Sequence, residues 1–447
     1  MRYLTLVLAC LLSGVSGPAL AWGNHTVAAY RAFEKMPEVL NAAPVLVEPL
    51  ETFLKAEEKP IEALLLSQEA WAVANLSAYA LRPAALTFTA NPSRPDDARR
   101  LAFLMALRIA PTARFALYFQ PDPRTPIDAS RLLAHTAVDT LPESPGATQR
   151  FIGLKAGEPI TPLRVLASAA DEPDYGLDIN LWQNSPSEWG KVYGFGALPF
   201  GNPALSYSTQ APFHMGFFHE DRVLYLAAPF LRRTFPLLRA HQYAGLAALA
   251  FRTGHPYWGW RFTGLSLHYV QDLTQPYHAS VSPGGSTLSL IFANALAMAG
   301  MPGKRDDLVV LLSNRHLALE RYQTQLLQNA ALTQQDTPFE KALRDTDGDA
   351  RYPPWSDAYL RDVVAREAYD FGPRLLQALV AAIPPGLVSD PAFDFGAHES
   401  SIDLVAEIAR QDPAKQARLD AAVAELLGHF GAHSRNAVRG ILKSGRP

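Results

Sequence analysis

Residues 264–278 read GLSLHYVQDLTQPYH, and this stretch decides the fold that we expect. No Gly or Pro lies between the opening glycine and Pro276, which predicts a helix with His268 and Asp272, four residues apart, on one face. Pro276 cannot continue that helix, so the chain turns and brings His278 back beside the first pair. Imidazole and carboxylate groups at this spacing form a ligand set that suits zinc.

A bare H-x3-D pair is more often a chance pair on a helix surface, whereas the full H-x3-D-x5-H motif with Gln-Pro in the second gap is specific. The motif resembles the metal-ligand core of the zinc-dependent phospholipase C and single-strand nuclease superfamily. Its members carry a similar H-x3-D-x3-P-x-H run on a central helix of an all-α fold. The run GLSLHY at residues 264–269 is most similar to the bacterial phosphatidylcholine-hydrolysing phospholipases C.

The first residues have the features of a secretory signal. Arg2 supplies a positive charge, residues 3–12 form a short apolar run, and small residues precede a cleavage site after Ala21. Cleavage there removes Cys10, the only cysteine, so the mature chain uses no disulfides. A lipoprotein site at Cys10 is the rival interpretation. We expect cleavage after Ala21, Trp22 as the new N-terminus, and a secreted, extracellular or periplasmic, protein.

In the superfamily, a Trp at the mature N-terminus binds zinc through its amino group and its carbonyl oxygen, and a His follows nearby. The resemblance therefore implies that Trp22 and His25 hold one ion together. Farther along, His316 and Glu320 again stand four residues apart on an expected helix. The phospholipases carry Glu at the position of Glu320, whereas the nucleases usually carry Asp.

Asp174 and Tyr175 resemble the Asp-Tyr pair of the phospholipases. The resemblance implies that Asp174 binds zinc and acts as the general base, and that Tyr175 helps to form the headgroup pocket. Asp171 and Asp178 compete with Asp174, because loops rich in Asp are usually solvated turns.

The next ligand of the superfamily is a His within an aromatic stretch. Here both His214 and His219 are candidates, and the order of the neighbouring aromatic and acidic residues favours His214. Carried over residue by residue, the resemblance implies three zinc ions: one held by Asp174, His214, His268 and Asp272, a second by Trp22, His25 and a shared Asp272, and a third by His278, His316 and Glu320.

Outside these motifs we expect one catalytic domain over residues 22–447, after a signal peptide at residues 1–21. Residues 32–170 separate ligands that stand closer together in compact relatives, and we interpret them as an inserted helical subdomain. Residues 182–210 are expected to form a loop near the mouth of the site, and several other segments are expected to be helical. The helical segments are residues 60–79, 95–108, 286–302, 356–383 and 401–443.

The segment at residues 286–302 is apolar, but its Asn294 and its modest length favour a buried helix, or a surface that meets lipid, over a membrane span. The formal net charge of the chain is −3, with 40 Lys and Arg against 43 Asp and Glu, and no basic block is present. This composition gives no electrostatic footprint for tight duplex binding, so we expect no stable nucleic-acid partner.

The function that we expect is a secreted, monomeric zinc phospholipase C, which hydrolyses the glycerol–phosphate ester of phosphatidylcholine-like lipids at a membrane surface. Two alternatives stay open. The first is a zinc-dependent single-strand nuclease or 3′-nucleotidase, against which Glu320, Tyr175 and the absence of a basic block argue. The second is an inactive lipid- or protein-binding module on the same fold, against which the complete ligand set argues.

Overall fold

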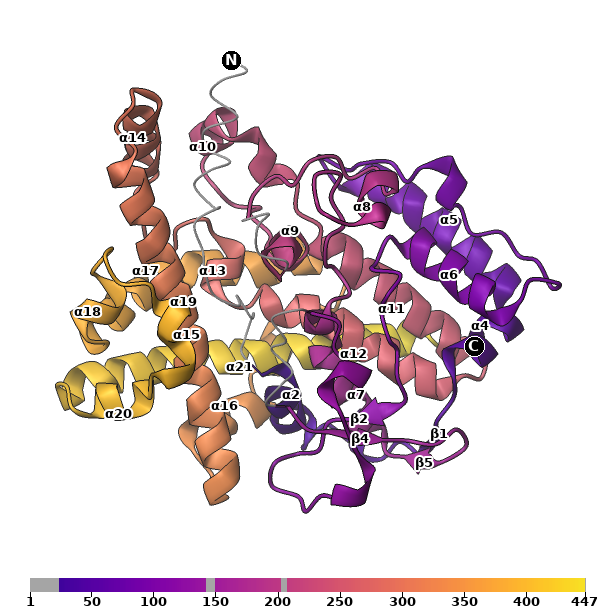
Figure 1. Cartoon of the computed structure of the whole chain (residues 1–447). Coiled ribbons are helices and arrows are strands. Elements are labelled where there is room, and N and C mark those ends of the chain that lie inside the picture. Colours follow the sequence, from indigo (N-terminus) through magenta and orange to yellow (C-terminus); the bar gives the residue numbers. More distant parts are fainter. Residues whose placement is uncertain (1–23, 142–148, 202–206, 447) are drawn as a thin grey trace.

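The computed structural model describes residues 24–141, 149–201 and 207–446, and most of these residues are helical (Figure 1). The predicted all-α class is therefore confirmed. The expected signal peptide and Trp22 lie outside the described residues. The α-helices are α2 (His25–Phe33), α3 (Pro37–Leu40), α4 (Leu50–Ala56), α5 (Glu58–Asn75), α6 (Asp96–Leu107), α7 (Pro162–Asp171), α8 (Glu188–Val192), α9 (Ala211–His214), α10 (Arg222–Ala227), α11 (Pro236–Arg252), α12 (Pro256–Asp272), α13 (Pro276–Ala279), α14 (Thr287–Met298), α15 (Gly303–Thr333), α16 (Pro338–Arg344), α17 (Ala365–Ala382), α18 (Pro385–Val388), α19 (Phe395–His398), α20 (Leu404–Ala409) and α21 (Pro413–Ser444).

The helices expected from periodicity are present, but the one expected from residue 356 begins later and the one expected over residues 401–443 is divided into two. Residues 60–79 correspond to α5, 95–108 to α6, 286–302 to α14, 356–383 to α17 and 401–443 to α20 and α21. Two further short elements matter below, the 3-10 turn η6 (Glu172–Tyr175) and the π-helical turn η10 (Leu360–Val364) that precedes α17.

We predicted a helical subdomain for residues 32–170, but the structure of this range is mixed. They contain two small antiparallel sheets, one in which β1 (Val45–Leu46) pairs with β5 (Pro159–Ile160), and one with the order β2 (Tyr118–Phe119), β4 (Phe151–Gly153), β3 (Leu132–Leu133). The strands are only two or three residues long. Buried residues of this range, such as Phe53 and Phe103, belong to the same continuous core as residues near the C-terminus.

Helix α12 lies at the centre of this core. Every side chain from Tyr257 to Asp272 is buried, as expected for a helix that other elements surround on all sides. Helices α7, α11 and α21 contact it. At Gly264 the approach of α7 leaves no room for a side chain, because an added Cβ would lie 2.5 Å from the Leu166 carbonyl oxygen and 2.6 Å from the Ala169 Cβ.

Two buried ion pairs fix the segment that follows α7 against the central helices. Arg261 of α12 binds Glu172 through one edge of its guanidinium group, with Nη2 to Oε1 at 2.6 Å and Nε to Oε2 at 3.0 Å. Arg239 of α11 binds Asp178, with Nε to Oδ1 at 2.8 Å. Both pairs are buried, so η6 between them has little freedom to move.

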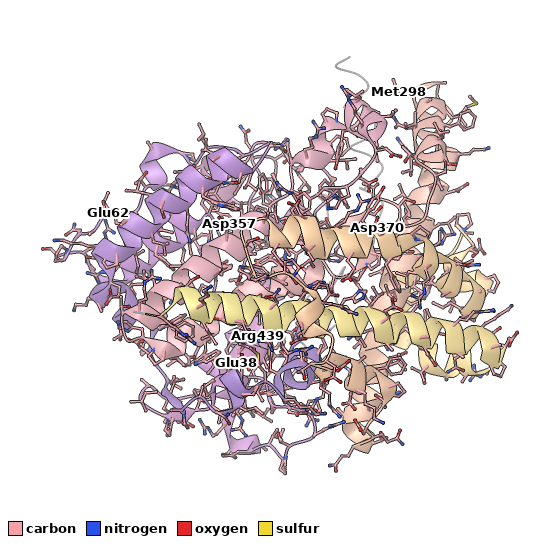
Figure 2. All side chains as sticks on the ribbon, turned by 180° about the vertical axis from the view of Figure 1, so that it is seen from behind. Glu38, Glu62, Met298, Asp357, Asp370 and Arg439 are labelled. Carbon is pink, nitrogen blue, oxygen red and sulfur yellow. The ribbon has the colours of Figure 1, made fainter. Side chains whose placement is uncertain are left out.

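The back of the molecule is formed by the long helix α21, which crosses it beside α17 (Figure 2). Helix α21 packs on α12, α2 and α16 and so closes the core from that side.

At the upper left of Figure 1, α14 and the first part of α15 project from the body, with α10 nearby. Among the described residues, no helix combines the length and the apolarity that crossing a membrane requires.

Candidate metal centre

Helix α12 ends at Asp272, the middle residue of the motif formed by His268, Asp272 and His278. Asp272 is the last residue of the helix, and His268 lies one turn before it. The chain then turns, because Pro276 starts the short helix α13 that carries His278. The side chain of Gln275 caps this turn, since its Oε1 accepts a hydrogen bond from the Tyr277 backbone N–H at 2.6 Å. The predicted helix–turn arrangement is therefore confirmed.

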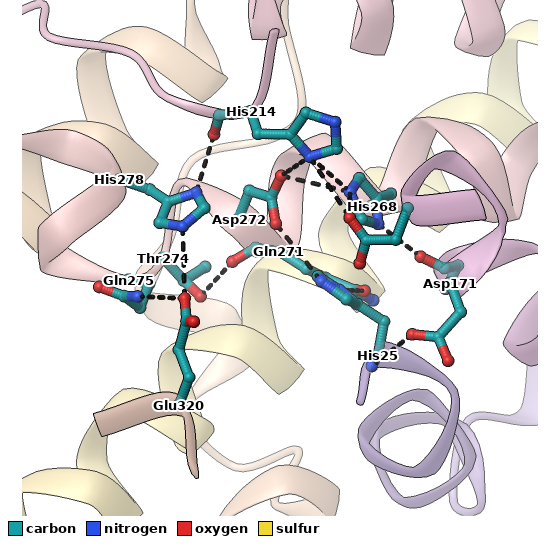
Figure 3. A network of polar contacts seen from close by, with 12 residues as sticks. His25, Asp171, His214, His268, Gln271, Asp272, Thr274, Gln275, His278 and Glu320 are labelled. Carbon is teal, nitrogen blue, oxygen red and sulfur yellow. Dashed lines mark hydrogen bonds and ion pairs between the residues drawn. The ribbon is translucent and has the colours of Figure 1, made fainter. Parts of the chain in front are cut away.

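Three imidazoles surround the buried carboxylate of Asp272 (Figure 3). Its Oδ1 lies 3.4 Å from Nε2 of His25, the first residue of α2. Its Oδ2 lies 3.0 Å from Nδ1 of His214 and 3.3 Å from Nε2 of His268. The two oxygens thus face different histidines, which is the geometry that a carboxylate shared between two cations requires.

Asp174 joins the same cluster from η6. Its Oδ1 lies 3.8 Å from Nδ1 of His214 and 3.6 Å from Nε2 of His268, and those two nitrogens are 2.9 Å apart. Asp174 stands two residues after Glu172, so the buried pair with Arg261 sets its position.

A separate group forms where α13 meets α15. Nε2 of His278 lies 3.1 Å from Nε2 of His316, and Oε1 of Glu320 lies 2.6 Å from His316 and 3.5 Å from His278. His316 and Glu320 are one turn apart on α15, so both reach the same point. Gln275 Nε2 donates to Glu320 Oε1 at 3.1 Å and ties this group to the turn after α12.

Three histidines of these groups, His25, His268 and His278, have their second ring nitrogen bonded from outside the group. His268 Nδ1 lies 2.7 Å from the Ala170 carbonyl oxygen, and His278 Nδ1 lies 2.9 Å from that of His214. Nδ1 of His25 lies 2.8 Å from Gln271 Oε1. A carbonyl oxygen can only accept a hydrogen bond. In the neutral form of each of these rings, Nδ1 therefore carries the proton and the lone pair of Nε2 points toward the other residues of the group.

The electrostatics of the site favour a neutral imidazole at His268 and at His316. Burial lowers the pKa of His268 well below its ordinary value and that of His316 to about 4. Burial also raises the pKa of Glu320 well above its ordinary value and that of Asp174 to about 7. Asp272 behaves differently: burial raises its pKa, but the imidazoles around it, His268 first, outweigh burial and hold it well below its ordinary value.

The pKa of His25 is shifted in the opposite direction to those of His268 and His316. Burial lowers its pKa, but the hydrogen bond and the charge of Asp272 outweigh burial and raise the pKa to about 9. In the absence of another cation, a proton on His25 is the charge that neutralises this carboxylate.

The residues fit a metal ion. Two polar atoms that face each other here, His25 Nε2 and Asp272 Oδ1, are buried without a hydrogen-bond partner. Burying such atoms unpaired is unfavourable, and a cation between them would satisfy both. By distance, the described residues contain three buried groups that could hold a metal ion: His25, His268 and Asp272; Asp174, His214 and His268; and His278, His316 and Glu320.

Known proteins give no further guide to this site. No family model, no curated protein and no solved structure matches this chain.

The alternatives that the sequence left open are separated by the geometry. His214, at the end of α9, is in the cluster, whereas Nε2 of His219 lies 2.7 Å from the Arg361 carbonyl oxygen at another place. Asp171 anchors α2, because it accepts hydrogen bonds from the His25 backbone N–H and the Thr26 hydroxyl.

One of the predicted site residues, Tyr175, does not join the cluster in the structure. The phenol of Tyr175 is buried and donates to Gln120 Oε1 at 3.0 Å, within a small core that includes Phe151. It therefore lies in the packing beneath η6 and not on the wall of the cavity described next. Trp22, the other ligand implied for the ion at His25, lies outside the described residues.

A cavity adjoins both metal-binding regions. Asp174, His214, His278 and His316 line it, together with a mainly apolar wall. Lys and Arg are missing from the described residues around this cavity. The predicted loop over residues 182–210 contributes to it, although the loop also contains α8. The apolar wall is formed by Phe200, Ala211, Met215, Phe217, Tyr277, Val281, Val309, Leu312 and Leu317.

Sequence reasoning missed the residues that orient the ligands. Gln271 and Gln275 follow His268 at helical spacings of three and seven, so the periodicity of the opening stretch was a signal for them. The buried pair of Arg261 and Glu172 had no local signal, because its members lie far apart in the sequence.

Proposed function

We propose that this chain is a secreted zinc-dependent phospholipase C with the all-α fold of the zinc phospholipase C and nuclease superfamily. Its substrates are phosphatidylcholine-like lipids at a membrane surface, and its products are diacylglycerol and phosphocholine. The chain acts as a monomer, and three zinc ions complete it.

One observation carries the proposal: residues of two of the buried metal-ligand groups, Asp174 and His214 of one and His278 and His316 of the other, line one cavity whose other walls are mainly apolar. A phospholipid needs both features, because its phosphodiester is anionic while the adjoining glyceryl ester region is apolar. A nuclease would be expected to surround its site with cations for the phosphate backbone, and the described residues of the cavity wall supply none.

The ligand assignment is the one that the resemblance implies, and the grouping of the described residues supports it. Asp174, His214, His268 and Asp272 would hold one ion, and His25 with Asp272 would hold a second together with Trp22. His278, His316 and Glu320 would hold a third. The donors are nitrogen and oxygen only, which suits zinc. The chemistry that zinc supplies when bound is polarisation of the phosphoryl oxygens and activation of water at neutral pH.

The residues of the chain have their own tasks in this reaction. Asp174 is the carboxylate of the cluster that also lines the cavity, so it is placed to accept a proton from water at the substrate. The apolar wall excludes bulk water around the ester and strengthens the electrostatic interactions inside. The outer hydrogen bonds to Ala170 and to Gln271 hold His268 and His25 in one tautomer.

The test is a paired assay on the purified mature protein that starts at Trp22. Phosphocholine release from a short-chain, monomeric phosphatidylcholine and cleavage of single-stranded DNA are followed with zinc, with a chelator, and after zinc is restored. We expect chelator-sensitive and zinc-restored phosphocholine release, intact DNA, and three zinc ions per chain by elemental analysis.

The other outcomes identify the alternatives. DNA cleavage without lipid turnover would assign the chain to the nucleases and leave the metal groups standing. A zinc content of three without turnover of either substrate would contradict the phospholipase proposal, and a zinc content well below three in inactive protein would favour a binding module.

A further inference from the structure

One flank of the molecule carries an exposed segment without charge. No residue between His278 and Lys304 is Asp, Glu, Lys or Arg, although charged residues make up 19% of the chain. The middle of this segment is α14, which lies against the first part of α15 and projects from the body of the protein (Figure 1). Surface helices of soluble proteins normally carry charges on the face that meets water, so this face is unusual.

The outward face of α14 is apolar. Leu288, 75% exposed, and Phe292, 57% exposed, stand four residues apart and so share one face of the helix, whereas Leu290 and Ala293 are buried. The exposed Met298 lies at the end of α14, where it projects from the body (Figure 2).

Helix α10 extends this apolar surface. Its Leu226 is 73% exposed, and Val223 is exposed as well. The two helices are in contact, and the Thr287 hydroxyl at the start of α14 donates to Asp221 Oδ2 at 2.6 Å, just before α10 begins. We call these residues together the apolar crest: Val223, Leu226, Leu288, Phe292, Met298 and Met301.

The crest adjoins the cavity of the metal centre. Leu224 of α10 packs in a small core with Phe217 and Val309, and both of these residues line the cavity. Val281, which leads from α13 into α14, lines the cavity too. Helices α10 and α14 therefore carry exposed apolar residues on their outer side and lie next to the residues that form the wall of the cavity.

We propose that the apolar crest docks the protein on the surface of a zwitterionic phospholipid bilayer and brings the adjoining cavity to the lipid. This inference rests on the proposed function, because the bilayer is also the source of the substrate. The crest offers aliphatic, aromatic and thioether side chains that can enter the interface. Two exposed cations flank it, Arg222 next to Val223 and Lys304, whose Nζ lies 5.9 Å from the centre of the Phe292 ring, and such long side chains can keep their charge in the headgroup water.

The missing charge also selects the kind of partner. Attachment to an anionic membrane uses clusters of Lys and Arg, and the segment between His278 and Lys304 has none. A protein interface of comparable size is normally surrounded by a polar and charged rim. An electrically neutral lipid surface complements an uncharged crest on a projecting helix.

The experiment measures vesicle binding separately from catalysis. Zinc-loaded full-length mature protein is mixed with phosphatidylcholine vesicles, and the bound fraction is measured by flotation. The variant Leu288→Asn/Phe292→Asn tests α14, and Leu226→Asn independently tests α10. Leu332→Asn is the matched control, because Leu332 is 74% exposed near the far end of α15. Melting temperatures confirm that each variant is folded.

We expect the wild type and Leu332→Asn to bind phosphatidylcholine vesicles equally, with little change at high salt. The double variant should partition at least about tenfold more weakly, since it removes two apolar side chains from the interface. Equal binding by the double variant and the control would overturn the proposal. Binding that requires anionic lipid and is lost at high salt would overturn it too.

The outcome is distinguishable from that of the proposed function, which is assessed with the wild type on monomeric phosphatidylcholine. Turnover of that substrate without vesicle binding would refute the crest as a docking surface and leave the phospholipase proposal intact. Crest-dependent vesicle binding without any turnover would do the reverse. A wild type that forms dimers through the crest, and does not bind vesicles, would identify a second copy of the chain as the occupant.

Discussion

The buried pair between Arg261 and Glu172 gives the sharpest test of how the centre is held together. Both side chains are almost completely buried, and two nitrogens of the guanidinium group, Nε and Nη2, contact the two carboxylate oxygens. Replacing Arg261 by Met removes the positive charge and leaves the Glu172 carboxylate buried without its partner. Because an unpaired buried charge is strongly unfavourable, we expect Arg261→Met to lower the free energy of unfolding by about 3–5 kcal/mol. This corresponds to a roughly 150- to 5,000-fold change in the unfolding equilibrium.

The effect should reach the metal centre, because Glu172 and Asp174 belong to the same short turn. We therefore expect Arg261→Met to bind zinc more weakly, by about 10- to 100-fold, the range known for residues that orient ligands. The assay is urea unfolding followed by tryptophan fluorescence, in zinc and in chelator, with zinc affinity measured by competition with a chromophoric chelator.

Two further variants make the reasoning refutable. Arg261→Met/Glu172→Leu removes both charges, so it should recover most of the lost stability. Arg366→Met breaks an exposed pair with Asp370 and should change the free energy of unfolding by less than about 1 kcal/mol. If Arg261→Met is no more harmful than Arg366→Met, or if the double variant is as unstable as the single one, the pair does not position the turn.

Four other predictions concern the centre itself. Asp272→Asn should lower turnover at least about a hundredfold and lower zinc content, because one carboxylate is expected to serve two ions; near-normal turnover would contradict this. His214→Ala should be severe and His219→Ala mild in the same zinc and turnover assays, and the reverse order would exchange their roles. Gly264→Ala should lower the free energy of unfolding by about 1–3 kcal/mol in thermal or urea melts, because the added Cβ meets α7; an unchanged melt would show that α7 can move away. An extra methionine before Trp22 should displace its amino group and lower the zinc content, whereas an unchanged zinc content would exclude that group as a ligand.

The parts of the centre that could be predicted from the sequence are those in which geometry is local. A helix of regular period fixes the relation of His268 to Asp272 and of His316 to Glu320, whatever surrounds it. The proline after the helix end fixes the turn that returns His278. These assignments needed only the order of residues and the dimensions of the α-helix.

The remaining parts depend on packing between distant segments. His214 and His219 are five residues apart in an irregular stretch, and contacts with distant segments decide which of them faces the centre. The Gly216 backbone N–H donates to the His278 carbonyl oxygen, and His219 Nε2 lies against the Arg361 carbonyl oxygen. Tyr175 follows Asp174 directly, but neighbouring side chains of a 3-10 turn point about 120° apart. Adjacency in the sequence therefore did not place the phenol in the cavity.

The mixed structure of residues 32–170 has a similar cause. Its helices α5 and α6 were visible as hydrophobic periods, whereas its strands are two or three residues long and leave no readable alternation. The cavity wall was equally hidden, because Phe200, Met215 and Val309 come from separate elements that meet only in the folded chain.

His214 belongs to both halves of the centre at once. Its ring faces Asp272 and His268, while its own backbone carbonyl oxygen accepts the hydrogen bond that orients His278 in the other group. Whatever fixes the ring of this one residue also fixes an acceptor for its neighbour, so we expect metal binding at the two halves to be thermodynamically linked. Linkage is reciprocal, so each half would favour metal binding at the other by the same free energy. We therefore expect partly loaded molecules to be scarce during a zinc titration.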